Sequence, residues 1–254
     1  MHGVAVGNNA SLNIMTPEIS FCGILLLASA FAAAYVCHRF TVKIRHRWQA
    51  LSAGVAMAYV FVSVMPELEE HRPIVAGSAM GTLLDAEKRI YLWALAGFVA
   101  FAGLSRLRFV QSANGARSKD GGIVYWGGMT GWGIYMLLIG YLLLHREDHS
   151  MLSLWLFVLA MGLHILMMDN QLVERFEDVY EPRGRMLLVA CLLVGWMLGC
   201  ADALPESFTS RLFAFVVGGV VITSAHEELS FEEGGRFAWF VGGAAAYATL
   251  LMLI

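Results

Sequence analysis

Residues 151–168 read MLSLWLFVLAMGLHILMM, a run of 18 residues that contains no Asp, Glu, Lys or Arg. A helix that crosses a bilayer needs about 20 predominantly apolar residues, so this run is suited to one span. Seven further apolar runs lie at residues 19–36, 48–65, 90–107, 123–144, 186–203, 212–225 and 237–254. Together they predict an all-α integral membrane protein, a bundle of eight transmembrane helices.

The composition of the chain supports this prediction. The chain is 58% hydrophobic and only 15% charged, with a mean hydropathy of +0.64. Soluble domains average about 45–50% apolar and about 25% charged residues, so lipid is the expected partner of this surface. The net charge of -3 and the lack of a long basic block predict no nucleic-acid partner. No phosphate loop or nucleophile elbow is present, and we expect no enzymatic activity.

The connectors between the runs are too short to fold alone, which predicts one transmembrane domain over residues 19–254. Residues 1–18 are a short polar segment, and they lack the basic start of a signal peptide. In an eight-span arrangement, the loops on one side hold five of the 17 Lys and Arg residues and those on the other side hold twelve. The positive-inside rule then predicts both termini outside. High apolar content without processing signals predicts a bacterial inner (plasma) membrane.

His164 is the clearest ionisable residue within a predicted span. Ionisable side chains at membrane depth are costly and are therefore candidates for function. Met168 lies four residues further and shares a helix face with His164, whereas Asp169 lies about 140° round the helix from His164. One interpretation is a metal or proton site with His164, Met168 and Asp169 as ligands. The other is a buried histidine that hydrogen-bonds to a neighbouring helix.

Two polar clusters lie at span ends. The first is Glu67, Glu69, Glu70 and His71, and the second is His226, Glu227 and Glu228, followed by Glu232 and Glu233. Each cluster is consistent with cation attraction at the mouth of a pathway, and equally with a solvated helix end.

The order of the spans resembles the ZIP (Zrt/Irt-like) family of divalent-metal transporters, which have eight spans and both termini outside. The run 50–67 ends in Ser63-Val-Met-Pro66-Glu67, similar to the family's His-Leu-Leu-Pro-Glu, with Ser63 at the position of that histidine. The third run holds a similar Gly97-Phe98 pair, and the seventh run looks like the family's glycine-bearing span. The resemblance therefore covers most of the chain.

The family's metal-binding motifs are only partly present. The fifth span reads His164-Ile-Leu-Met-Met168-Asp169 where the family has His-Glu-x-Pro-His-Glu. In the fourth span, residues 131–140 offer no imidazole, carboxylate or amide, whereas the family has His-Asn-x-Pro-Glu-Gly there. The resemblance thus implies a divergent member with an incomplete site.

For the function, the resemblance implies a divalent-metal transporter or metal-binding relative, with zinc first among the candidates before iron and manganese. The alternative is a ZIP-derived structural or regulatory subunit that no longer transports. Its partners would be a second copy of the chain in a homodimer or another subunit of a membrane complex.

Overall fold

We describe the chain from a computed structural model, which covers residues 17–37, 42–77, 88–113, 122–146, 150–180, 183–201, 204–228 and 236–253. The N-terminal residues 1–16 and the connectors between these ranges lie outside the described part. Every element within it is helical, and no strand occurs in these ranges. The predicted all-α class is therefore confirmed.

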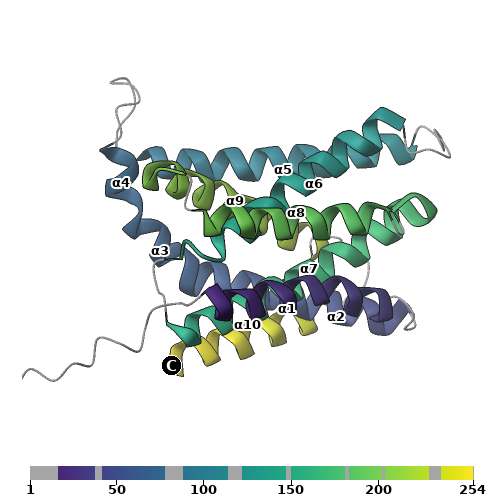
Figure 1. Ribbon diagram of the computed structural model, residues 1–254. Helices are drawn as coiled ribbons and strands as arrows, with labels where there is room; N and C mark the ends of the chain where they lie inside the picture. Colours follow the sequence, from purple (N-terminus) through teal and green to yellow (C-terminus); the bar gives the residue numbers. More distant parts are fainter. Residues whose placement is uncertain are drawn as a thin grey trace, which may run out of the picture.

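The long helices run side by side along one common direction, and two short helices turn across one end of them (Figure 1). In chain order they are α1 (Pro17–Cys37), α2 (Val42–Tyr59), the π-helical turn η1 (Val60–Val64), α3 (Met65–Glu70), α4 (Arg72–Ala76), α5 (Arg89–Ala113), α6 (Gly122–Leu142), α7 (Met151–Tyr180), α8 (Arg183–Cys200), α9 (Glu206–Glu228) and α10 (Arg236–Leu253). The short helices α3 and α4 mark one end of the bundle, which we call the α3 end.

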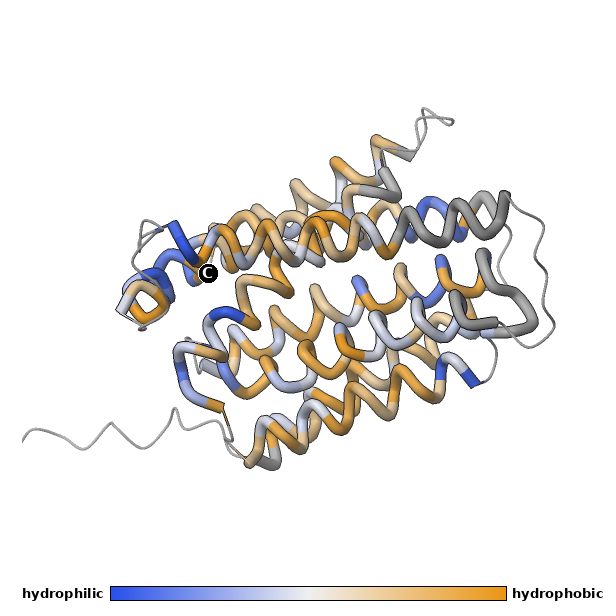
Figure 2. Tube along the Cα trace, turned by 90° about the horizontal axis from the view of Figure 1, so that it is seen from above, coloured by the Kyte–Doolittle hydropathy of each residue, from blue (hydrophilic) through white to orange (hydrophobic). Residues whose placement is uncertain are grey.

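Hydropathy is distributed along the helices as a membrane protein requires. Apolar residues dominate the middle of the bundle and polar residues gather toward its ends (Figure 2). Among the described residues, five helical segments are long and apolar enough to cross a bilayer, at Ile19–Cys37, Ile44–Glu70, Met151–Glu174, Arg183–Cys200 and Glu206–Ala225. The other three expected spans lie in α5, α6 and α10. The membrane character is thus supported, while eight spans and the sidedness of the termini stay predictions.

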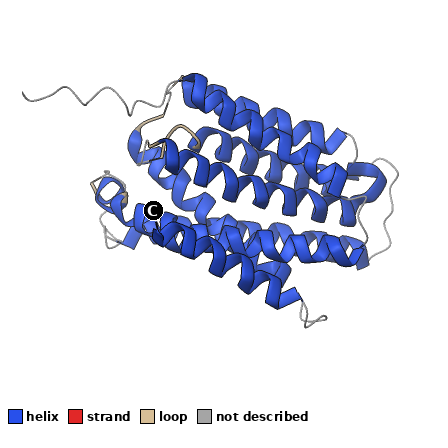
Figure 3. Cartoon of the chain, turned by 90° about the horizontal axis from the view of Figure 1, so that it is seen from below, coloured by secondary structure: helices blue, strands red, loops and turns tan. Residues whose placement is uncertain are grey.

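The long helices pack in two groups, which appear as two layers in Figure 3. The first group holds α1, α6, α7 and α8, with α1 against α7 and α8, and α6 against α8. The second group holds α2, α5, α9 and α10, with α2 against α10 and α9, and α5 against α9. The groups meet chiefly where α2 contacts α7, and also where α6 contacts α5 and α9. We call this boundary the seam.

Glycines bring three helix pairs into backbone contact, and each of these pairs lies within one group. A Cβ on Gly97 of α5 would lie 1.9 Å from the carbonyl oxygen of Phe215, and a Cβ on Gly218 of α9 would lie 1.9 Å from that of Ala94. Neither position has room for a side chain, so both require glycine. The same reciprocal arrangement joins α2 to α10 through Gly54 and Gly243, and α6 to α8 through Gly140 and Gly195.

Candidate functional site

His164 lies in the middle of α7 and is fully buried at the seam. Its Nε2 lies 3.0 Å from the hydroxyl of Tyr135 on α6, in its own group. Its Nδ1 lies 3.4 Å from the hydroxyl of Ser224 on α9, in the other group. The imidazole therefore bridges the two groups through one hydroxyl from each. This is the hydrogen-bonded histidine that one of the two sequence interpretations described.

Aromatic rings and a third hydroxyl, that of Thr223, lie near His164 and its two hydroxyl partners. The ring of Tyr135 lies 4.6 Å from that of Phe101 on α5 and 5.7 Å from that of Trp132, centroid to centroid. Thr223, beside Ser224, donates its hydroxyl to the carbonyl of Gly219 at 2.7 Å. The surroundings of His164 are thus apolar apart from neutral hydroxyl groups, and they give the imidazole no carboxylate within hydrogen-bond distance among the contacts described.

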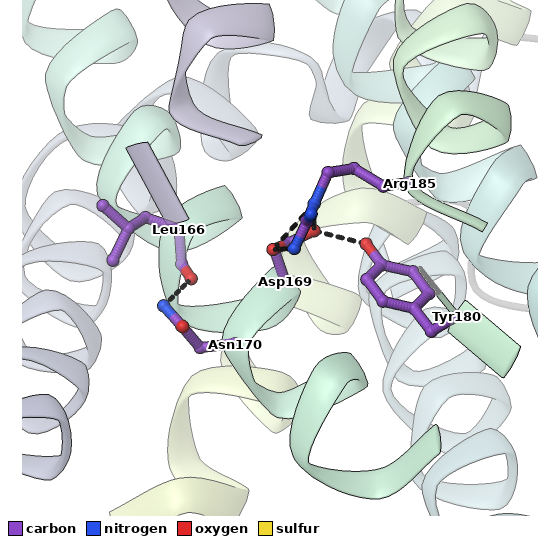
Figure 4. A network of polar contacts seen from close by, with 5 residues as sticks. All are labelled: Leu166, Asp169, Asn170, Tyr180 and Arg185. Carbon is purple, nitrogen blue, oxygen red and sulfur yellow. Dashed lines mark hydrogen bonds and ion pairs between the residues drawn. The ribbon is translucent and has the colours of Figure 1, made fainter. Parts of the chain in front are cut away.

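Asp169, five residues beyond His164 on α7, belongs to a different network (Figure 4). Its carboxylate accepts hydrogen bonds from Arg185 on α8, with Nη2 2.8 Å from Oδ2 and Nε 3.1 Å from Oδ1. The hydroxyl of Tyr180 donates to the same carboxylate. The guanidinium of Arg185 also lies 5.5 Å over the ring of Tyr35 on α1. The charge of fully buried Asp169 is therefore compensated within the first group.

The network changes the acid–base properties of Tyr180, which lies beyond the apolar part of α7. Burial, and then the negative charge of Asp169, raises the pKa of the Tyr180 phenol well above its usual range. Neighbouring Asn170 takes no part in the network, and instead donates to the carbonyl of Leu166 at 2.9 Å (Figure 4).

The structure does not unite the three predicted ligands. Met168 is buried in the apolar core, His164 contacts hydroxyls at the seam, and Asp169 is bound by Arg185. Within the described ranges, no group of three or more His, Cys, Asp and Glu residues is placed to hold a metal ion. Because α7 is α-helical through these residues, Asp169 points away from the face that His164 and Met168 share. A site built from all three would also require Asp169 to leave Arg185.

The cluster at the α3 end is divided between three environments. Glu67 and Glu70 line an open cavity of about 620 Å³. Glu69 points elsewhere, with an oxygen 2.7 Å from Nε of Arg72. His71 is buried, and its Nδ1 lies 2.9 Å from the hydroxyl of Ser210 on α9. At the other cluster, residues 226–228 continue α9, but their side chains lie outside the described part, as do residues 232–233 altogether.

We call this open space the α3-end cavity. Its walls come from α2, η1, α3, α7, α10 and the residue before α7, namely Tyr59, Ser63, Pro66, Glu67, Glu70, Ser150, Leu152, Ser153, Leu156 and Leu251. A second, small cavity of about 30 Å³ shares Tyr59 and Glu67 with it. The small cavity extends toward Met161, three residues before His164 on α7, and it is also lined by Arg146.

At the opposite end of the bundle, α2 and α7 are joined across the seam. Nε of Arg45 lies 2.8 Å from Oε1 of Glu174, and Nε2 of Gln49 donates to the same oxygen at 3.3 Å. His46 lies 3.9 Å from that carboxylate. The seam is thus closed by charged and amide groups at this end, whereas the α3-end cavity opens at the other.

Sequence reasoning missed three residues of this arrangement. Tyr135 lies on the span that lacks imidazole, carboxylate and amide groups, and a phenol was not considered as a partner. Arg146 lies in the connector between two predicted spans, where a solvated cation is expected, yet it is only 3% exposed. Ser224 is an ordinary small polar residue, and only the tertiary fold brings it to His164.

No protein-family model matches the chain, and no curated protein matches it.

Proposed function

We propose that this protein is a ZIP-like membrane carrier with eight spans and both termini outside, whose cargo is a divalent metal ion, with zinc first. The observation that carries the proposal is the position of His164. Its two ring nitrogens contact hydroxyls from two different helix groups, Tyr135 on α6 and Ser224 on α9. A buried polar contact at the boundary between two groups suits a carrier, because relative motion of the groups can open such a contact from either side.

The bundle contains closely packed helix pairs, each of which lies within one of the two groups. Reciprocal glycine contacts hold α6 to α8 in one group, and α5 to α9 and α2 to α10 in the other. The contacts of His164 across the seam are instead made by side chains, which can change partners at a lower cost than closely packed backbones. In this scheme an ion enters through the α3-end cavity, where Glu67 and Glu70 provide negative charge, and then reaches His164 and Met168 on one face of α7.

The test is metal binding and flux in the full-length protein. We expect reconstituted protein to take up Zn²⁺ into vesicles, and we expect His164→Ala to weaken Zn²⁺ binding by about tenfold or more, as the loss of a key ligand does. His145→Ala is the matched control, since His145 lies beyond the end of α6 and its ring stacks on Tyr141 at 4.3 Å, without a described contact to His164. Equal Zn²⁺ affinity in wild type and His164→Ala would exclude this cargo site.

A second function has its own supporting observation. Asp169 is held by three hydrogen bonds from Arg185 and one from Tyr180, and the described residues offer no cluster of three metal-binding side chains. These facts favour a non-transporting structural or regulatory subunit of a membrane complex, or of a homodimer. A partner that co-purifies reproducibly in mild detergent, together with no Zn²⁺ flux, would support this function, and flux by the isolated chain would exclude it.

A further inference from the structure

The one π-helical turn in the described part of the chain, η1, lies where the two cavities adjoin. Val60 and Val64 line the small cavity and Ser63 lines the α3-end cavity, while the flanking Tyr59 and Glu67 line both. A π turn inside an α-helix is rare and is frequently found at a functional site. The irregular backbone therefore marks the walls of these cavities, and not only the surroundings of His164, as a place to expect a ligand.

The walls carry both signs of charge. Glu67 and Glu70 supply carboxylates to the α3-end cavity. Arg146 lines the small cavity behind them, is 3% exposed, and has its guanidinium 5.6 Å from the ring centre of Phe157. Its Nη1 donates to the hydroxyl of Ser153 at 2.8 Å, and Ser153 in turn lines the α3-end cavity. Two carboxylates thus line the α3-end cavity, and a buried guanidinium lies one hydrogen bond behind its wall, at Ser153.

We propose that the α3-end cavity binds a small zwitterion of the α-amino acid class. Its ammonium group lies against Glu67 and Glu70, and its carboxylate is directed toward Ser153 in the wall and the guanidinium of Arg146 behind it. Guanidinium groups pair well with carboxylates because both are planar and form charge-assisted hydrogen bonds. Leu152, Leu156 and Leu251 form the apolar part of the wall and suit an aliphatic side chain.

Size and electrostatics favour this ligand over a bare metal ion in the cavity. The volume of about 620 Å³ lies in the range of small-molecule sites, about 300–1,000 Å³. A zwitterion can use the two carboxylates in the wall and also the positive charge of Arg146 behind Ser153, whereas a metal ion uses the carboxylates alone. The inference goes beyond the proposed metal cargo: the metal would pass these carboxylates on entry, but its proposed ligands His164 and Met168 line neither cavity.

The experiment is isothermal titration calorimetry of the full-length protein in detergent micelles. The probes are glycine, L-leucine, L-lysine and L-glutamate, with ZnCl₂ beside them. We expect L-leucine to bind, and we expect N-acetyl-L-leucine, which lacks the ammonium group, and L-leucinamide, which lacks the carboxylate, to bind about tenfold more weakly or worse. These analogues test both charged contacts without changing the buried Arg146.

Two variants on one helix make the test specific. Glu70→Gln removes an exposed carboxylate from the cavity wall and should weaken L-leucine binding by about tenfold. Glu69→Gln, one residue away, removes a carboxylate that pairs with Arg72 and should leave the affinity within about twofold. Binding of none of the four amino acids, or equal affinity in Glu70→Gln, would overturn the proposal. Zn²⁺ binding that depends on Glu70 without any amino-acid binding would also overturn it. L-leucine binding should survive His164→Ala, which separates this outcome from that of the metal proposal.

Discussion

Arg45 on α2 and Glu174 on α7 form an ion pair across the seam, with Nε 2.8 Å from Oε1, at the end of the bundle opposite the α3-end cavity. Tyr59, in the cavity wall, lies fourteen positions after Arg45 on α2, which is about 21 Å along a helix. The bundle is thus open at one end of the seam and tied at the other. If the protein is a carrier, as we propose, this arrangement corresponds to one state of it, with access from the α3 end.

The first prediction concerns this ion pair. In a double-mutant cycle of Arg45→Met and Glu174→Gln, we expect a coupling free energy of about 0.5–1 kcal/mol, because both side chains are partly exposed. Reversible unfolding in mixed micelles measures it. The exposed pair Glu69–Arg72 is the control and should couple more weakly. If the protein is a carrier, Arg45→Met should also increase the labelling of cysteines placed beside Glu174. Unchanged labelling would contradict the role of this pair as a closure.

A larger effect is expected at Asp169 and Arg185. Removing one member of a buried ion pair leaves the other charge uncompensated, at a cost of about 3–5 kcal/mol. We therefore expect Arg185→Met to destabilise the protein strongly, and Asp169→Asn together with Arg185→Met to recover much of the loss. The measurement is the free energy of unfolding of the two single variants and the double variant. Additive losses in the double variant would show that the two groups do not depend on each other.

Glycine substitutions on α5 test the close packing of that helix. Gly97→Ala places a Cβ 1.9 Å from the carbonyl oxygen of Phe215, so α5 and α9 must move apart. Overpacking of this kind costs about 1–3 kcal/mol. Gly103→Ala is the matched control on the same helix, where an added Cβ meets no described atom within 4 Å. We expect a lower thermal midpoint for Gly97→Ala alone, and equal midpoints would disprove the contact.

Alkaline pH should weaken the Tyr180 network. The pKa of the Tyr180 phenol is raised in the folded protein, chiefly by burial and then by Asp169. The folded state therefore retains this proton at a pH where the unfolded chain, with a pKa of about 10, releases it. The stabilisation is complete below about pH 10 and is lost as the pH rises toward the folded pKa. Thermal midpoints from pH 8 to 11.5 should fall more steeply for wild type than for Tyr180→Phe, and parallel curves would contradict this.

Much of the fold could be predicted from the sequence, because apolar length is a local property. The run at 151–168 predicts a span, and α7 indeed begins at Met151. The end of α7 was predicted less well, since the helix continues for 12 more residues through polar sequence to Tyr180. This extension is held by the contact of Tyr180 with Asp169, a tertiary interaction that hydropathy does not reveal.

The candidate site could be predicted only in part. His164 was identified from its cost in lipid, and the structure places it in the interior as expected. Its partners come from helices 29 and 60 residues away in the chain, so no local spacing indicates them. The involvement of Arg185 with Asp169 follows from the packing of α8 against α7, which one sequence does not determine.

The π turn between Val60 and Val64 also means that the direction of the glutamates in α3 depends on the number of residues before them, as well as on their identity. One residue more or less in an α-helix rotates everything beyond it by about 100°. Deletion of a single residue from this turn would leave the apolar composition of the span unchanged. It would turn Glu67 and Glu70 away from the α3-end cavity. The number of residues in the π turn therefore determines whether these carboxylates face the cavity.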